Sequence, residues 1–514
     1  MSERTERPPG GLAGGGLAAF LTGHPGSPET PVLHWKDGAL TLGELTTAAR
    51  ALAGRLGPVA RAPVACVVDG GASAVTAMFA TWLAGGVCVP VNSRLSDAEV
   101  RDHLLAAGPA AVVVGPAHLD RVPRHLNRLV EREPRSWLPE PATATWAGAS
   151  FPEDAALVMR TSGTTGAAKP IVLRHDGVRD GIDTVIARLR GGSARSAARP
   201  PMPNLIPSSL ALWAGIWNTL FSFRLGAPAV LLDRFDTRDY AEVVRRFGIR
   251  STILAPAMMT MLSEDPRVTD LSPLKFVRSI TAPLTPGQAR RFHERFGVDV
   301  LNCYGQTELG GEVVGWTAAD IREFGDAKLG AVGRPHPGVT VRVLDERREE
   351  VPAGEPGEIW IRSPFAMQGA ELASDRVVDG FLRTGDLGRL DADGFLWIEG
   401  RVSDMINRGG MKIVPQEVEE VLRRHPQVAD ACVAGVPDER LGEVPMAWIQ
   451  PVPGERPDES SVRAFAREAL AGYKVPVAVR VVDGFPRTEI GKVLRRALVA
   501  GHNGTLSPEG MDSP

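Results

Sequence analysis

The sequence predicts an α/β protein with a large N-terminal domain and a small α+β C-terminal domain. Between Leu42 and Leu301, short apolar runs alternate with helical patterns, which is typical of parallel sheets covered by helices. Short strand-like segments dominate between Val339 and Arg362. Beyond Arg401 a compact series of helices and strands begins again, so we place a domain boundary at residues 401–404.

The large domain contains two regions in which strands and helices alternate. The first opens with a helical pattern after Leu42, and its apolar runs predict strands at 64–68, 87–90 and 112–114, with helices at 75–83 and 97–107. Residues 131–150 are rich in Pro, Ala and Glu and are expected to form a connector. The second region predicts strands at 229–232 and 252–254, each followed by a helix.

Two further groups of elements complete the chain. Strands at 339–344 and 357–362 flank the turn 351–354, which indicates an antiparallel segment that closes the large domain. The C-terminal unit predicts helices at 415–424 and 462–470 and strands at 429–434, 446–450 and 477–482. The expected domains are 31–401 and 402–500, and the polar, Gly- and Pro-rich arms 1–30 and 501–514 are expected to be disordered.

Composition is that of an ordinary soluble protein. The 514 residues are 43% hydrophobic, enough for several cores, and the net charge of −3 offers no broad basic surface for nucleic acid or an acidic membrane. With no apolar signal segment and no run of 18 apolar residues, we expect a cytoplasmic protein. The four cysteines are far apart and are expected to be reduced core residues: Cys66, Cys88, Cys303 and Cys432.

A Gly-, Ser- and Thr-rich segment follows the apolar run 155–159. Its glycines let backbone N–H groups approach an anion, and its hydroxyls and lysine add donors. It is not a Walker A motif, because Pro170 follows the lysine where that motif has Ser or Thr. We predict that the segment holds a polyphosphate through Thr161, Ser162, Gly163, Thr164, Thr165, Gly166 and Lys169.

Four more strings follow in order. They are Asn-Cys-Tyr-Gly-Gln-Thr-Glu at 302–308, Thr-Gly-Asp at 384–386, Gly-Arg-Val-Ser-Asp-Met-Ile-Asn-Arg-Gly-Gly at 400–410, and Pro-Arg-Thr-Glu-Ile-Gly-Lys at 486–492. With the phosphate segment, they resemble the adenylate-forming superfamily of acyl-CoA synthetases, peptide-synthetase adenylation domains and luciferases, over residues 30–498. The resemblance implies two α/β subdomains and a small β-rich subdomain in the large domain, and a mobile small domain.

The resemblance also implies a reaction with ATP, Mg²⁺ and CoA. A carboxylate attacks the α-phosphate of ATP to give an acyl-adenylate and pyrophosphate, and a thiol then displaces AMP. Tyr304 would stack on adenine, Thr307 would donate to the α-phosphate and Glu308 would hold the metal, while Asp386 would accept the ribose hydroxyls with Arg401 as its partner. Ala282 is expected among the nucleotide-binding residues.

The C-terminal domain is expected to supply the remaining groups. By resemblance, Lys492 neutralises charge on the carboxylate and the phosphate during adenylation. Ser403 stands at the rotation hinge, where many relatives have Asp or Lys, and Gly409 and Gly410 would approach the thiol tunnel after rotation. Met411 replaces a common Glu, so the thiol step is the less secure of the two.

The acid pocket is expected near the start of the helix 210–221. Pro207 to Leu210 stands where many relatives have an aromatic residue and a His that gate the carboxylate. The expected pocket residues are Ser208, Ser209, Trp213, Trp217 and Thr281. The two tryptophans lie in an apolar stripe that is equally compatible with plain core, and no Asp stands there to pair an ammonium group, so we expect an acid without an α-amino group.

The sequence therefore predicts an AMP-forming acid–thiol ligase, with a small carboxylic acid and CoA as partners. Two alternatives remain. The first is a stand-alone adenylating enzyme that passes its acyl group to a carrier-protein thiol or to a separate enzyme. The second is a nucleotide-binding regulator without catalysis, which the presence together of Glu308, Asp386 and Lys492 disfavours.

Overall fold

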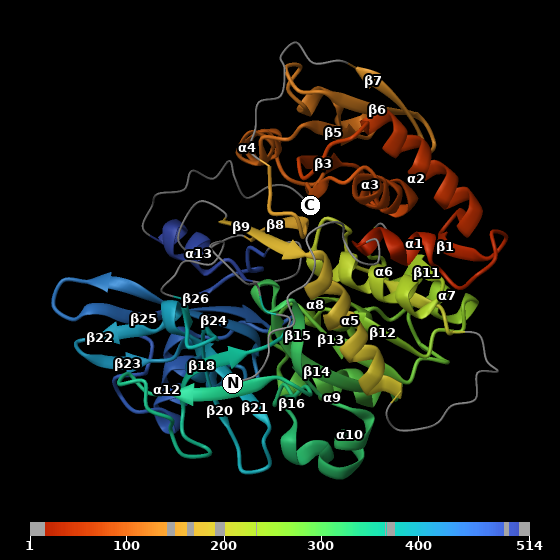
Figure 1. The fold of residues 1–514 in the computed structure, drawn as a ribbon. Coiled ribbons are helices and arrows are strands. Elements are labelled where there is room, and N and C mark those ends of the chain that lie inside the picture. The colour runs from red at the N-terminus through yellow and green to blue at the C-terminus, as the bar shows by residue number, and fades with distance from the viewer. Residues whose placement is uncertain are drawn as a thin grey trace, which may run out of the picture.

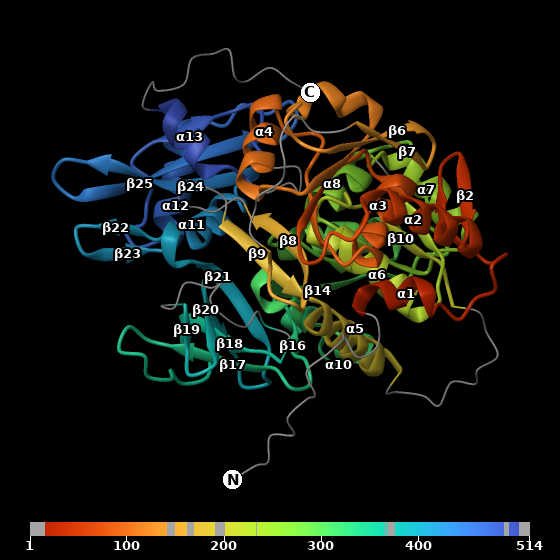
Figure 2. The same ribbon diagram turned by 45° about the horizontal axis from the view of Figure 1, so that its top comes forward.

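A computed structural model gives the architecture of the chain (Figure 1). It describes residues 16–140, 150–161, 169–190, 201–232, 234–364, 366, 376–487 and 493–502. The large N-terminal part holds three sheets and most of the helices. A separate antiparallel sheet follows, which we call the β-rich sheet, and the small C-terminal domain lies beside it in both views (Figures 1 and 2). The predicted fold class is confirmed.

The first α/β unit is a seven-stranded sheet. Its strand order is β7-β6-β5-β3-β4-β8-β9, and its five inner strands run parallel. Every residue of β3 is buried, as expected for a strand covered on both faces. The strands are β3 (Pro63–Val67), β4 (Val87–Pro90), β5 (Ala111–Val114), β6 (Arg128–Glu133), β7 (Ser136–Glu140), β8 (Ala155–Thr161) and β9 (Lys169–Arg174). The helices of this unit are α2 (Leu42–Leu56), α3 (Gly71–Leu83), α4 (Asp97–Ala107), η2 (Pro116–Arg121) and α5 (His175–Arg190).

The second α/β unit consists of two neighbouring sheets. One has the order β10-β11-β1-β2 and the other β12-β13-β14-β15-β16, and the Thr252 hydroxyl joins them by donating to the Leu205 carbonyl at 2.8 Å. The strands are β1 (Pro31–Trp35), β2 (Gly38–Thr41), β10 (Asn204–Ile206), β11 (Ala229–Leu231), β12 (Ser251–Leu254), β13 (Phe276–Ser279), β14 (Asp299–Gln306), β15 (Gly311–Gly315) and β16 (Arg334–Pro335). The helices are α6 (Trp213–Leu225), α7 (Thr237–Arg246), α8 (Pro256–Glu264), α9 (Pro286–Phe296), η3 (Thr307–Leu309), α10 (Ala318–Phe324) and η4 (Gly325–Lys328).

Residues 16–35 differ from the expectation of a disordered arm that reaches residue 30. Gly16–Ala18 forms η1 and Ala19–Thr22 forms α1, and four apolar residues of these two helices are buried: Leu17, Ala18, Phe20 and Leu21. The Leu17 backbone N–H also donates to the Nδ1 atom of the buried His175, at 3.1 Å. The apolar residues Leu17, Phe20 and Leu21 lie at helical spacing, which indicates a helix. The disordered arm was expected because glycines are frequent around these residues.

The β-rich sheet and the C-terminal domain follow the predicted patterns. The sheet is antiparallel, with β17 (Thr340–Leu344), β18 (Gly357–Arg362), β19 (Val377–Val378), β20 (Phe381–Leu390) and β21 (Leu396–Arg401). The small domain holds η5 (Val402–Asp404), β22 (Ile406–Arg408), β23 (Met411–Ile413), α11 (Pro415–Leu422), β24 (Val428–Asp438), β25 (Gly442–Pro451), α12 (Glu459–Ala469), β26 (Val479–Val481) and α13 (Arg495–His502). In the described part of the chain, no helix has the length and apolar character needed to cross a membrane.

Candidate active site

The predicted site segments leave the sheets at the carboxyl ends of their strands. In the first sheet β4 and β8 are parallel, and residues 162–168 follow β8. In the second unit β13 and β14 are parallel, so residues 281–282 and 307–308 leave the same edge of their sheet. Ligands of open α/β sheets bind outside the carboxyl ends of the strands. The fold therefore brings these segments to the edges where a ligand is expected.

Asp386 is the centre of a hydrogen-bonded cluster at this edge. The Tyr304 hydroxyl at the end of β14 donates to its Oδ2 atom at 2.5 Å, and the Gln306 amide donates to the same oxygen at 2.6 Å. On the other side, the Nε atom of Arg401 lies 3.0 Å from Oδ1. Asp386 and Arg401 are register partners on β20 and β21. Three separate strings of the sequence thus meet in one cluster.

Thr384 fixes the position of Asp386 through two hydrogen bonds. The Thr384 hydroxyl donates to the Ile359 carbonyl at 2.7 Å and accepts the Asp386 backbone N–H at 3.1 Å. Asp386 is only 4% exposed. Burial, together with the neighbouring Asp386 carboxylate, raises the pKa of Tyr304 well above its usual range, so its hydroxyl remains a donor. A carboxylate offers about four acceptor sites, so three protein donors leave capacity for a ligand hydroxyl.

Thr307 and Glu308 lie in the short helix η3, directly after β14. The Glu308 carboxylate pairs with the Arg376 guanidinium at 3.2 Å, and Arg376 also donates to the Arg383 carbonyl at 3.3 Å. Gly305 allows the strand to turn back on β15, because a Cβ atom there would lie 2.0 Å from the Gly311 carbonyl oxygen. The turn fixes where Thr307 and Glu308 leave the sheet.

Sequence reasoning missed Gln306 and Arg376. Gln306 lies inside the string Tyr-Gly-Gln-Thr-Glu, where a polar side chain beside two site residues was an available signal. Arg376 is 68 positions from its partner Glu308, and nothing in the local sequence marks it.

Several predicted residues lie outside the described part of the chain. Thr161 ends β8 and Lys169 begins β9, where they are register partners, but Ser162, Gly163, Thr164, Thr165 and Gly166 between them are not described. Lys492 is also outside the described residues. The roles of these residues in binding phosphate and in catalysis therefore remain predictions.

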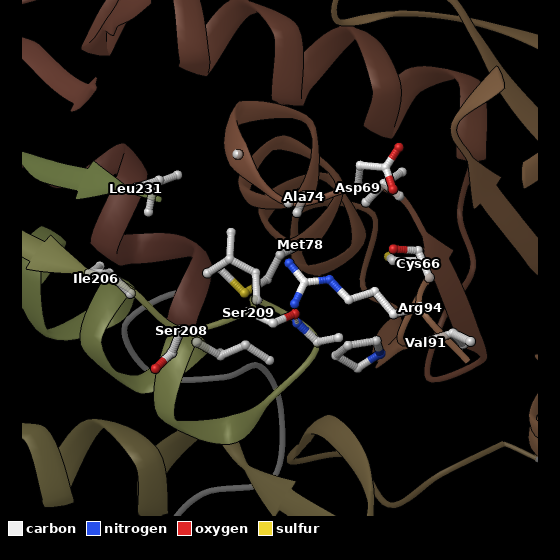
Figure 3. A pocket seen from close by; sticks show the side chains of 18 of the residues that line it. Cys66, Asp69, Ala74, Met78, Val91, Arg94, Ile206, Ser208, Ser209 and Leu231 are labelled. Atoms are coloured by element: carbon white, nitrogen blue, oxygen red, sulfur yellow. Dashed lines mark hydrogen bonds between the residues drawn. The ribbon is translucent and has the colours of Figure 1, made fainter. Parts of the chain in front are cut away.

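The predicted acid-pocket residues divide into two groups. Ser208 and Ser209 line a cavity of about 250 Å³ between the first and second α/β units (Figure 3). Trp213 and Trp217 do not line it; a Cβ atom on Gly311 would lie 3.4–3.6 Å from their indole nitrogens, so they pack on the β14–β15 turn. Thr281 is exposed and also lies outside the cavity lining.

The backbone at Thr281 is strained. Its φ is 71°, a left-handed conformation that is unfavourable for a β-branched residue. Its hydroxyl donates to the Ile280 carbonyl at 2.6 Å, and the Ala282 N–H donates to the same carbonyl at 2.9 Å. Such strain clusters at functional sites, which is consistent with the expected position of Ala282 at the nucleotide.

The comparisons with known proteins agree with this geometry. Residues 24–369 match the AMP-binding enzyme family, and residues 417–492 match the AMP-binding enzyme C-terminal domain. The chain belongs to the AMP-binding enzyme family.

Three relatives illustrate the range of this family. The chain is 31% identical to a feruloyl-CoA synthase from Amycolatopsis, over 91% of this chain and 95% of that protein. It is 29% identical to the fatty acid–[acyl-carrier-protein] ligase ScoC from Streptomyces coeruleorubidus, over 82% and 83%. The ATP-bound crystal structure of MatB from Rhodopseudomonas palustris superimposes with a TM-score of 0.82 at 26% identity, covering 95% of this chain and 99% of MatB.

In this AMP-binding enzyme, the predicted thiol-tunnel glycines form the tip of the β22–β23 hairpin. Gly409 and Gly410 have φ values of 58° and 88°, and the Gly410 N–H donates to the Asn407 side-chain oxygen at 3.0 Å. Next to them, Lys412 forms an ion pair with Glu346 at the turn after β17. The hairpin therefore contacts the β-rich sheet at the turn after β17, whereas Tyr304, Thr307 and Glu308 lie at the carboxyl end of β14.

The predicted hinge lies between two sheets. Arg401 ends β21, and β22 begins at Ile406 in a different sheet. Ser403 lies in η5 between them, and its hydroxyl donates to Asp404 at 3.0 Å. Asp404 in turn lies 3.5 Å from Arg495 of α13. Rotation about this segment is a prediction that its position supports.

Proposed function

We propose that this enzyme activates a carboxylic acid with ATP and transfers the acyl group to the thiol of CoA. The observation that carries the proposal is the cluster of Tyr304, Asp386 and Arg401 at the carboxyl end of β14. Membership of the AMP-binding enzyme family and the similarity to a feruloyl-CoA synthase support it. The reaction is that of an AMP-forming acid–thiol ligase.

Each group of the cluster has a part in nucleotide binding. The Tyr304 ring offers a face for adenine, since aromatic side chains bind bases by stacking. Asp386, fixed by Gln306 and Arg401, keeps acceptor capacity for a ribose hydroxyl. Thr307 follows β14 directly and would donate its hydroxyl to the α-phosphate.

The residues present fit a magnesium ion at Glu308. Mg²⁺ binds through one or two carboxylates together with substrate phosphates and water, and the Glu308 carboxylate follows Thr307, which we expect to contact the α-phosphate. When bound, the metal would neutralise phosphate charge. Arg376, already 3.2 Å from Glu308, would keep this carboxylate oriented.

The first step forms one bond and breaks one. A carboxylate oxygen of the acid attacks the α-phosphorus of ATP, and the bond from that phosphorus to the β-phosphate oxygen breaks to release pyrophosphate. Lys492 would offset the negative charge that accumulates at the phosphate. The acyl-adenylate remains beside Thr307.

The second step requires the small domain to rotate. Rotation about residues 401–404 would bring the hairpin that carries Gly409 and Gly410 to the cleft. The thiolate of CoA then attacks the acyl carbonyl, a thioester forms, and AMP leaves with the electron pair of the broken C–O bond.

The similarity to ScoC favours one alternative for the second step. ScoC is a ligase that uses an acyl-carrier protein, so a carrier-protein thiol is a candidate acceptor in place of CoA. Met411, which is 44% exposed, stands where many relatives have Glu, so the hairpin offers no carboxylate at this position. With either acceptor, a thiol attacks the acyl-adenylate and a thioester forms.

Pyrophosphate release with a panel of carboxylic acids, with and without CoA, tests the proposal. We expect release with one class of amine-free acid and formation of its CoA thioester. Pyrophosphate release in which acyl-AMP persists with excess CoA would favour the carrier-protein acceptor. Absence of pyrophosphate release and of ATP–pyrophosphate exchange with every acid would contradict the proposed function.

A further inference from the structure

The chain pairs with itself on either side of Lys492. Arg487 and Val493 are partners in an antiparallel bridge, and the Leu494 backbone N–H donates to the Pro486 carbonyl at 2.8 Å. The residues between these partners lie outside the described part of the chain, but Lys492 directly precedes Val493 in the sequence. Since consecutive Cα atoms are about 3.8 Å apart, the position of Val493 limits where the Lys492 backbone can lie.

Arg487, on the first side, is held by a carboxylate of β24. Its guanidinium lies 2.8 Å from the Asp430 Oδ2 atom. The other oxygen of Asp430 accepts a hydrogen bond from the Nε atom of Arg423, also at 2.8 Å. Arg423 directly follows α11 and donates to the Ala431 carbonyl at 2.7 Å. The first side is therefore connected to the end of α11.

The second side is held by a carboxylate on α11 itself. Arg495, the first residue of α13, donates to the Glu419 Oε1 atom at 2.7 Å. The same oxygen accepts the Val433 backbone N–H at 2.9 Å, and Oε2 lies 3.4 Å from Arg423. Glu419 is only 3% exposed. The three elements that supply these groups, α11, β24 and α13, lie within the small domain (Figure 2).

These side chains form one charged network, which consists of Glu419, Arg423, Asp430, Arg487 and Arg495. Arg423 is its centre, because it pairs with both carboxylates, and each carboxylate also binds one of the two flanking arginines. Apolar residues in place of buried ion pairs are often as stabilising, so stability alone does not require such a network. Its charged hydrogen bonds are directional, and they fix both sides of the Lys492 segment relative to α11.

The adenylation step is expected to depend on the exact position of Lys492. A displacement of about 1 Å in an active site can lower a rate by about a hundredfold. We propose that Glu419, Arg423 and Asp430 are positioning residues, which hold the two sides of the segment so that Lys492 meets the reacting phosphate. This positioning role rests on the proposed function and on the predicted role of Lys492.

Glu419→Gln and Asp430→Asn test the two sides of the network separately. Each substitution keeps the size of the side chain and an acceptor oxygen, and removes the negative charge that holds the arginines. Arg495 is a poorer choice, because it also lies 3.5 Å from Asp404 in the expected hinge.

Glu417→Gln is the matched control. Glu417 lies on α11 two positions before Glu419, but its exposed carboxylate pairs with Lys474 at 2.6 Å, outside the charged network. The control therefore removes a carboxylate and an ion pair from the same helix and leaves the contacts of Arg487 and Arg495 in place.

Single-turnover measurements follow acyl-adenylate formation and thiol capture of a supplied acyl-adenylate separately. We expect Glu419→Gln and Asp430→Asn to lower the rate constant of adenylation at saturating ATP by about tenfold. KM for ATP and the rate of thiol capture should stay within about twofold of the unmodified enzyme, because the nucleotide cluster is unchanged. Glu417→Gln should keep both rates.

A double-mutant cycle separates positioning from a loss of folding. If the network acts through Lys492, Glu419→Gln should change adenylation by less than about twofold in an enzyme that already carries Lys492→Ala. A loss of folded protein would lower both half-reactions by the same factor, with or without Lys492. Asp430 is only half-buried, so Asp430→Asn supplies the same cycle if Glu419→Gln does not fold.

Three results would overturn the positioning role. They are unchanged adenylation in both network variants, equal loss in the two half-reactions, and the same fold-loss of adenylation with Lys492 present and replaced. Failure of the unmodified enzyme to form an acyl-adenylate with any acid would instead contradict the proposed function.

Discussion

At the scale of single residues, the Asp386 carboxylate is contacted by three protein side chains. It binds Tyr304, Gln306 and Arg401 before any nucleotide is considered. These donors orient both carboxylate oxygens, so a ribose hydroxyl would meet an acceptor that is already fixed. The cluster is therefore a preorganised site.

Asp386→Ala should weaken ATP binding by about 1.5–3 kcal/mol, the range for hydrogen bonds to a charged group. The variant should also distinguish less between ATP and deoxyribose ATP than the unmodified enzyme. Equilibrium binding of both nucleotides measures the effect. Tyr304→Phe is the control, because it removes one donor to Asp386 and keeps the aromatic face. An unchanged preference for ATP in Asp386→Ala would place the ribose elsewhere.

Lys492→Ala should lower acyl-adenylate formation by about a hundredfold or more, because charge at the transition state would lose its electrostatic partner. Capture of a supplied acyl-adenylate by the thiol should be preserved. Single-turnover measurements of the two half-reactions distinguish these steps. Lys474→Ala, which removes an ion pair with Glu417 in the same domain, is the control. Equal loss in both half-reactions would contradict the assignment.

At the scale of elements, the β22–β23 hairpin is joined to the β-rich sheet by the ion pair between Lys412 and Glu346. The proposed rotation of the small domain would break this contact. Because both side chains are largely exposed, the pair holds the observed arrangement only weakly.

Glu346→Gln should therefore accelerate the thiol half-reaction by up to about fivefold and leave adenylation unchanged. Rapid-mixing measurements of thioester formation from preformed acyl-adenylate test this, with Glu349→Gln near the same turn as the control. A slower thiol step in Glu346→Gln would show that the contact assists the rotation.

The elements also show what sequence patterns can and cannot predict. The strand at 64–68 and the helices at 415–424 and 462–470 agree closely with β3, α11 and α12 because their periodicity is local, whereas α13 was not predicted. The cavity was not, because its walls join residues as distant as Ala74 and Ile216. Likewise, Arg376 meets Glu308 only through the fold. The site strings were predictable because each is continuous in sequence.

At the scale of the whole molecule, the segment 16–22 attaches to the α/β core through a buried histidine. Burial lowers the pKa of His175 to about 4; the Asp176 carboxylate opposes this shift to a smaller extent, and the Arg179 guanidinium adds to it. The Nδ1 atom accepts a hydrogen bond from the Leu17 N–H, which requires the unprotonated ring nitrogen. Protonation would break this contact.

The free energy of unfolding should therefore decrease as the pH is lowered and His175 becomes protonated. The folded pKa lies below the ordinary value of about 6.5, so the contribution is fully present above pH 6.5 and is lost toward pH 4, amounting to about 3 kcal/mol. Burial and the neighbouring Asp176 raise the pKa of Asp154 to about 6, which acts in the opposite direction. Only a difference between variants isolates the histidine.

Thermal unfolding between pH 4 and 8 should show a smaller decline in His175→Asn than in the unmodified protein. Asparagine retains an acceptor for the Leu17 N–H and does not titrate. Identical pH profiles for the two proteins would contradict a buried, neutral His175.

Arg401 belongs both to the Asp386 cluster and to the connection between the two domains. It is the last residue of β21, the partner of Asp386, and the residue directly before the segment on which the small domain is expected to turn. The residue that we expect to border the ribose is therefore also the residue next to the expected hinge. We expect the hinge to be least flexible while AMP is bound. Release of AMP would then determine when the C-terminal domain returns to its starting position for the next reaction cycle.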